Sequence, residues 1–83
     1  MSNAMVTIRL FGQLCEYGGS RTFQIQAETL KEALDLAVEK GVDKKLLRGA
    51  LIFLNNRPLS RNRLGKKLSE GDEIALLSPA GGG

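Results

Sequence analysis

Two segments near the start of the chain alternate between apolar and polar residues. In residues 5–11 every second residue is apolar, and the same period returns in residues 22–27. A two-residue period is that of a β-strand with one buried face. The residues between them include the turn-forming pair Gly18-Gly19. The pattern therefore predicts a β-hairpin.

A helical period follows the two strands. From Leu30 to Val38 the apolar residues recur at spacings of three and four, which predicts an amphipathic helix with one apolar stripe. Thr29 and Glu32 have the spacing of a capping box at its start, and Gly41 is a typical residue just after a helix end.

Two apolar runs in the second half predict two further strands. Residues 50–54 are all apolar, which favours a central strand or one with both faces covered, and residues 72–77 form the last strand. Residues 55–58 are a predicted turn. Leu64 and Leu68 are expected to hold an irregular segment against the core.

This order of elements predicts an α+β fold of the β-grasp, or ubiquitin-like, class. The expected sheet is mixed, has about four to five strands and packs on one main helix. A single domain would occupy residues 5–79, followed by a flexible glycine tail at residues 80–83. Residues 1–4 are interpreted as an expression-tag remnant before a native start at Met5 and are excluded from the fold.

Composition limits the chemistry that the chain can perform by itself. It has no histidine and one cysteine, Cys15, which excludes histidine-based triads and both histidine and multi-thiolate zinc sites. Glu70, Asp72 and Glu73 are interpreted as solvated loop charges, and Cys15 as a small apolar filler. The single cysteine, the absence of a visible signal peptide and the lack of a long apolar run predict a cytoplasmic protein without a membrane partner.

The formal charge of +3 reflects basic residues in the second half of the chain. Aromatic residues make up only 5% of the chain, and no base-stacking motif is interleaved with the basic ones, which argues against a nucleic-acid partner. An acidic protein partner or a solvated surface fits better. The basic residues are Lys44, Lys45, Arg48, Arg57, Arg61, Arg63, Lys66 and Lys67.

The sequence Pro79-Ala80-Gly81-Gly82-Gly83 directly follows the last predicted strand. Pro79 has no N–H and ends strand pairing, so the tail would leave the sheet in a fixed direction. Glycine has no Cβ, and such a tail can carry its carboxylate through a narrow channel into another protein's active site. A frayed end without a function is the alternative.

In their order and spacing these motifs resemble the molybdopterin synthase small subunit and related ubiquitin-like sulfur carriers, including ThiS-like proteins. The resemblance starts at Met5 and is carried by residues 8–16 and 54–58. Its most specific part is residues 70–79, followed after two residues by Gly82-Gly83. The chain departs from the family at Cys15, where arginine is common, and at Gly81, which replaces a residue with a side chain.

The resemblance implies that a ubiquitin-activating-type adenylyltransferase uses ATP and magnesium to adenylate the Gly83 carboxylate. Sulfur from a sulfurtransferase or cysteine desulfurase would then convert it to a thiocarboxylate. Inserted into the large subunit, within a heterotetramer, this terminus would donate sulfur to the pterin precursor of the molybdenum or tungsten cofactor. The chain would be a non-catalytic subunit that holds no metal or cofactor stably.

In this hypothesis Gly83 is the residue whose carboxylate is modified, and Gly82, which has no side chain, lets the tail pass through the partner's narrow channel. Carriers for thiamine thiazole synthesis, ubiquitin-like protein modifiers and non-covalent binding modules are the alternatives. Core packing explains the apolar candidates equally well. The residues expected to contact partners are Pro79, Ala80, Gly81, Phe11, Phe53, Leu77 and Arg57, with Arg9 and Lys66 adding charge at the rim.

Overall fold

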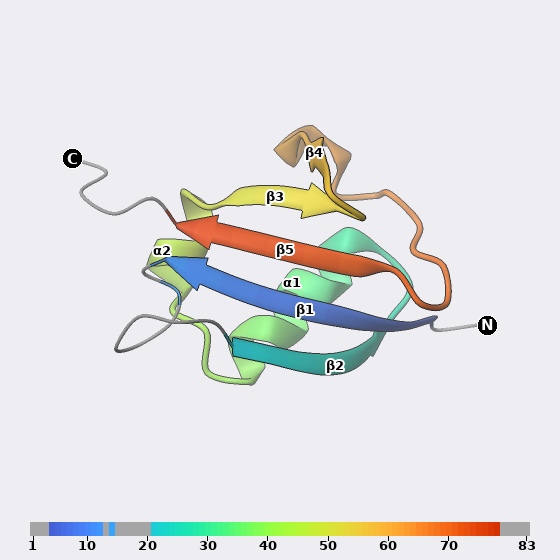
Figure 1. Ribbon diagram of the computed structural model, residues 1–83, viewed down its shortest axis with the longest axis horizontal. Coiled ribbons are helices and arrows are strands. Elements are labelled where there is room, and N and C mark those ends of the chain that lie inside the picture. Colours follow the sequence, from blue (N-terminus) through green and yellow to red (C-terminus); the bar gives the residue numbers. More distant parts are fainter. Residues whose placement is uncertain (1–3, 13, 15–20, 79–83) are drawn as a thin grey trace.

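The computed structural model describes residues 4–12, 14 and 21–78, and it has the predicted β-grasp architecture. A mixed sheet of five strands is covered on one face by helices (Figure 1). The elements are β1 (Ala4–Gly12), β2 (Arg21–Ala27), α1 (Leu30–Glu39), α2 (Lys44–Arg48), β3 (Leu51–Leu54), β4 (Arg57–Leu59), the short 3₁₀ helix η1 (Arg61–Arg63) and β5 (Glu73–Ser78).

The strands lie in the order β2-β1-β5-β3-β4. β1 and β2 are antiparallel, as the predicted hairpin requires, with Val6 opposite Ile25. β5 runs parallel to β1 and antiparallel to β3, so the last strand in sequence lies at the centre of the sheet. β3 is therefore an interior strand, which was one of the two predicted possibilities.

The predicted domain start differs from the observed strand by one residue. β1 begins at Ala4, which pairs with Ala27 and is only 7% exposed. Ala4 therefore takes part in the fold, although the sequence interpretation excluded it.

The core lies between one face of the sheet and α1. Alternate residues of β1 and β5 point into it, which is the consequence of the two-residue period of a strand. The apolar stripe of α1 closes the core from the other side. The fully buried large side chains are Val6, Ile8, Leu10, Leu30, Ile74 and Leu76.

The start of α1 has the predicted capping bonds. Thr29 Oγ1 accepts a hydrogen bond from the Glu32 N–H at 3.3 Å, and Glu32 Oε1 accepts one from the Glu28 N–H at 2.7 Å. The second bond thus goes to the residue before the N-cap. Gly41, just beyond the helix, has φ +104°, a conformation that favours glycine.

Two features outside the sheet were not predicted correctly. The short helix α2 was missed, although Asp43 caps it by accepting from the Lys45 N–H at 2.8 Å. Leu68 is buried as expected, but Leu64 is 37% exposed. The Leu64 carbonyl accepts from the Lys31 N–H at 2.9 Å, so it is the backbone of this segment that is held against α1.

A turn was predicted over residues 55–58, but only Asn55 and Asn56 form it, as a two-residue hairpin connection between β3 and β4. Arg57 and Pro58 already belong to β4, a short strand that the sequence did not indicate. Asn55 and Asn56 have φ values of +51° and +70°. Two successive positive values match a type I′ turn, whose twist suits the flanking strands, and asparagine tolerates this conformation better than most residues.

Candidate functional site

The sheet face opposite the helices carries a patch of apolar side chains, which we call the open-face patch. In register, Phe11 lies beside Leu77, and Leu77 lies beside Leu51. In the neighbouring row on the same face, Phe53 lies beside Ala75. These side chains are half-buried, except Leu51, which is 50% exposed. The open-face patch consists of Phe11, Leu51, Phe53, Ala75 and Leu77.

The open-face patch therefore brings together three of the predicted partner-binding residues. Phe11, Phe53 and Leu77 line a shallow pocket of about 460 Å³. Their half-buried state separates them from the core residues of the same strands, Leu10, Ile52 and Leu76. An apolar patch of this kind on a sheet face is characteristic of a protein–protein contact.

A charged pair borders the patch on β1 and β5. The Arg9 guanidinium lies 5.3 Å from the centre of the Phe11 ring, and Arg9 Nη1 lies 3.5 Å from Glu73 Oε1. Both charged side chains are more than a third exposed, so water screens the pair and it adds little to stability. Its place at the rim suits a role in orienting a partner.

β5 ends at Ser78, which is 5% exposed and lies opposite Gly12 in the parallel ladder. Gly12 has φ +68°, and a Cβ at this position would overlap the carbonyl oxygen of Ser78. Only glycine fits here without a shift of the strand end. Sequence reasoning missed this role, although a glycine at the last position of a strand was a usable signal.

The residues predicted to carry the chemistry lie beyond this strand end. Their point of attachment is Ser78, the residue that directly follows Leu77 of the open-face patch in β5. The candidates outside the described residues are Cys15, Pro79, Ala80, Gly81, Gly82 and Gly83.

Arg57 lies away from the open-face patch. Its neighbour Pro58 pairs with Phe53, whereas Arg57 pairs with Leu54, and Arg57 lines a separate pocket of about 530 Å³ with Arg63 and Lys66. Of the basic residues that the sequence singled out in the second half of the chain, a second group, Lys44, Lys45 and Arg48, lies on α2. Within the described residues, Arg57, Arg63 and Lys66 form no ion pair.

The acidic residues before β5 hold a turn together. Asp72 accepts hydrogen bonds from the Ser69 N–H at 2.7 Å and from Asn55 Nδ2 at 3.0 Å. Asn55 Oδ1 in turn accepts from the Glu73 N–H at 2.9 Å, and Glu70 Oε1 accepts from the Met5 N–H at 3.0 Å. These contacts are structural. The interpretation as solvated loop charges was therefore wrong for Glu73, which is the first residue of β5, and it missed the hydrogen bonds that Glu70 and Asp72 accept.

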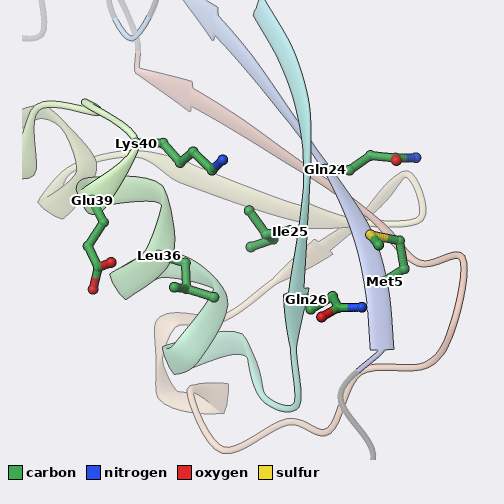
Figure 2. Close-up of a pocket in the computed structure, with 7 residues that line it drawn as sticks. All are labelled: Met5, Gln24, Ile25, Gln26, Leu36, Glu39 and Lys40. Carbon is green, nitrogen blue, oxygen red and sulfur yellow. The ribbon is translucent and has the colours of Figure 1, made fainter.

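A larger pocket, of about 620 Å³, lies beside the edge strand β2 (Figure 2). Ile25 and Leu36 face each other between β2 and α1, and the Lys40 side chain extends towards β2 (Figure 2). Among the described residues that line it, Glu39 is the one acidic side chain. None of the described residues that line this pocket belongs to the open-face patch, so the two sites are distinct.

The model of the ThiS family matches residues 8–83. The chain belongs to the ThiS family. Members of this family are ubiquitin-like sulfur carriers, and the match includes β1 from Ile8 onward, the other four strands, the open-face patch and the strand end at Ser78. No curated protein sequence matches the chain significantly.

Solved structures similar to this ThiS-family chain include proteins from bacteria, archaea and a eukaryote. One belongs to a complex of subunits 1 and 2 of the molybdopterin-converting factor from Helicobacter pylori, with 37% identity, a TM-score of 0.73 and coverage of 95% of this chain and 99% of that one. SAMP1 from Haloferax volcanii has 26% identity, a TM-score of 0.76 and coverage of 96% and 100%. Urm1 from Trypanosoma brucei, with 20% identity, a TM-score of 0.65 and full coverage of both chains, shows the same fold.

None of the helices that the structure describes in this ThiS-family chain combines the length and the apolar character needed to span a bilayer.

Proposed function

We propose that this protein is the sulfur-donating small subunit of a molybdopterin synthase, with the Gly83 carboxylate as the group that becomes a thiocarboxylate. The observation that carries the proposal is the position of the open-face patch. It reaches Leu77, one residue before the strand end at Ser78. A partner that docks on the patch therefore lies next to the root of the tail.

The similarity to a chain of the Helicobacter molybdopterin-converting factor supports this pathway. The identity of 37% extends over 95% of the chain. That protein is in a complex of two subunits, and we propose an equivalent large subunit as a partner of this chain. Leu51, Phe53 and Leu77 would form the apolar centre of the contact, with Arg9 and Glu73 at its rim.

The proposed chemistry takes place in the active sites of partners in the cytoplasm. The Gly83 carboxylate attacks the α-phosphorus of ATP on the adenylyltransferase, and pyrophosphate leaves. A persulfide from a sulfurtransferase or cysteine desulfurase attacks the acyl-adenylate and displaces AMP, and a thiol then cleaves the S–S bond so that one sulfur stays on Gly83. The large subunit transfers this sulfur to the pterin precursor.

Intact mass spectrometry tests the proposal directly. The full chain is incubated with the adenylyltransferase, ATP, magnesium and a persulfide donor. We expect a mass increase equal to the difference between one sulfur and one oxygen atom, located at Gly83. An unchanged mass in the presence of an active adenylyltransferase would refute the sulfur-carrier function.

Deletion of Gly83 tests which glycine is the reactive one. The shortened chain still ends in Gly-Gly, but its reach from β5 is less by one residue, or about 3.5 Å. We expect no thiocarboxylate and a thermal stability close to that of the full chain. A chain with one glycine added after Gly83 is the matched control for length, and it should also fail. Modification of the shortened chain would show that the Gly81-Gly82 pair is the reactive terminus.

A protein-modifier function is the second candidate. The observation that favours it is the similarity to SAMP1, a small archaeal modifier protein, at 26% identity over 96% of the chain. In the same experiment with cell extract added, a modifier forms isopeptide conjugates between Gly83 and lysines of other proteins. Two results together support the function as a synthase subunit. The first is a thiocarboxylate without conjugates, and the second is sulfur transfer to a pterin precursor when the large subunit is added.

A further inference from the structure

A small pocket lies in the helical layer, among α1, α2 and the residue that follows η1. We call it the α1–α2 pocket. Its volume is about 190 Å³, and its apolar walls are Leu34, Val38, Leu47 and Leu64. A protein cavity of about 150 Å³ can hold benzene, so this space suits one large apolar side chain. Leu64 is 37% exposed, so the pocket is open to solvent on the side that Leu64 forms.

Backbone hydrogen bonds hold each wall of the α1–α2 pocket in place. The Lys31 N–H donates to the Leu64 carbonyl at 2.9 Å, and this bond ties the wall formed by Leu64 to α1. The Val42 N–H donates to the Ala37 carbonyl at 3.1 Å, and this bond fixes the turn between α1 and α2. The pocket is therefore formed before any ligand arrives, and binding requires little ordering of the protein.

The rim of the α1–α2 pocket is positively charged. Lys44 and Arg48 line it and lie four residues apart on α2, hence on the same side of that helix. Lys31 and Asp35 also line it, and they neutralise each other in an ion pair of 2.9 Å, so the net positive charge comes from Lys44 and Arg48. In the described part of the chain, Lys44 and Arg48 have no carboxylate within ion-pair distance. An apolar centre with two unpaired cations at its edge complements an apolar side chain flanked by carboxylates.

We propose that the α1–α2 pocket binds a short acidic segment of a partner protein, with one large apolar side chain inserted between Leu34, Val38 and Leu64. The pocket belongs to the helical layer, whereas the open-face patch is on the opposite face of the sheet (Figure 1). Both surfaces can therefore be occupied at the same time. The proposal does not depend on the sulfur-carrier chemistry.

Amide chemical shifts in the ¹⁵N-labelled full chain measure the binding. The probe is the peptide Ser-Asp-Glu-Asp-Phe-Asp-Glu-Asp-Ser. We expect saturable shifts that centre on the α1–α2 pocket. Two control peptides, one with serine in place of phenylalanine and one with asparagine and glutamine in place of the acidic residues, should each bind at least about tenfold more weakly.

Matched variants locate the contact. Lys44→Glu removes a rim cation at the first position of α2, where a carboxylate is tolerated, and Lys45→Glu changes the neighbouring residue, which does not line the pocket. Leu64→Ala and Leu51→Ala form a second pair, on opposite faces of the molecule. Lys44→Glu and Leu64→Ala should each weaken binding about tenfold, and Lys45→Glu and Leu51→Ala should leave it nearly unchanged.

Three results would overturn the proposal. The first is the absence of saturable shifts with the acidic peptide, and the second is a set of shifts that centres on the open-face patch. The third is an equal loss of affinity in Lys44→Glu and Lys45→Glu, because this would reduce the effect to general attraction by a basic protein.

Discussion

Replacement of Gly12 by alanine tests whether the close approach of β1 to the end of β5 positions the root of the tail. Alanine at φ +68° costs about 1–2 kcal/mol relative to an ordinary conformation. The added Cβ also overlaps the Ser78 carbonyl oxygen and comes within 3.2 Å of Leu77 Cδ1, and relief of such overlap typically costs about 1–3 kcal/mol. Alanine also lowers the conformational entropy of the unfolded chain, and this stabilises the folded state by about 0.4–1 kcal/mol.

We therefore expect Gly12→Ala to lower the free energy of unfolding by about 2–4 kcal/mol, and the melting temperature by of the order of 15 °C. Urea denaturation followed by circular dichroism measures the first quantity, and calorimetry measures the second. Under the proposed function, the displaced strand end should also slow adenylation of Gly83 at a temperature at which the variant is fully folded.

Substitutions at two other glycines separate the cost of the positive φ from the cost of the overlap with Ser78. Gly71 has φ +87° but no atom within 4 Å of an added Cβ, so Gly71→Ala should cost only about 1 kcal/mol. Gly65 has open space and no positive φ, and Gly65→Ala should change stability by less than about 1 kcal/mol. An equal loss in Gly12→Ala and Gly71→Ala would refute the reasoning, because the contact with Ser78 would then contribute nothing.

Two further predictions concern the capping box and the open-face patch. Thr29→Ala removes the acceptor for the Glu32 N–H and should lower the free energy of unfolding by about 1 kcal/mol in urea denaturation. The control Thr22→Ala, at an exposed position of β2, should lower it clearly less. Equal losses in the two variants would argue against the cap. Leu51→Ala should leave the fold intact but weaken binding of the large subunit about tenfold in calorimetric titration, and an undiminished affinity would remove the patch from the proposed interface.

The parts of the fold that follow from local periodicity were predictable from the sequence. The alternation in residues 5–11 and the three-to-four spacing from Leu30 to Val38 indicate β1 and α1 because each pattern is confined to one element. The helix α2 was missed because five residues are too few to establish a period. The apolar run of β3 did not reveal that Leu51 is exposed, since the coverage of a face depends on where the helices pack.

The candidate site was predictable in its residues more than in its geometry. Phe11, Phe53 and Leu77 were chosen because their strands are apolar on both sides, and the register brings all three together. The separation of Arg57 from them depends on the type I′ turn, which sets which face of β4 it occupies. The role of Gly12 involves a residue 66 positions away, which no local pattern can indicate.

The central position of β5 has a consequence for how the protein is made. A chain whose synthesis stops before residue 73 contains only two separate strand pairs, β1 with β2 and β3 with β4, because β5 is the strand that joins them. An isolated strand pair is at best marginally stable in water. Incomplete chains therefore stay unfolded and open to proteolysis. Only chains that include β5, the strand that bears the tail, can therefore fold into a stable protein.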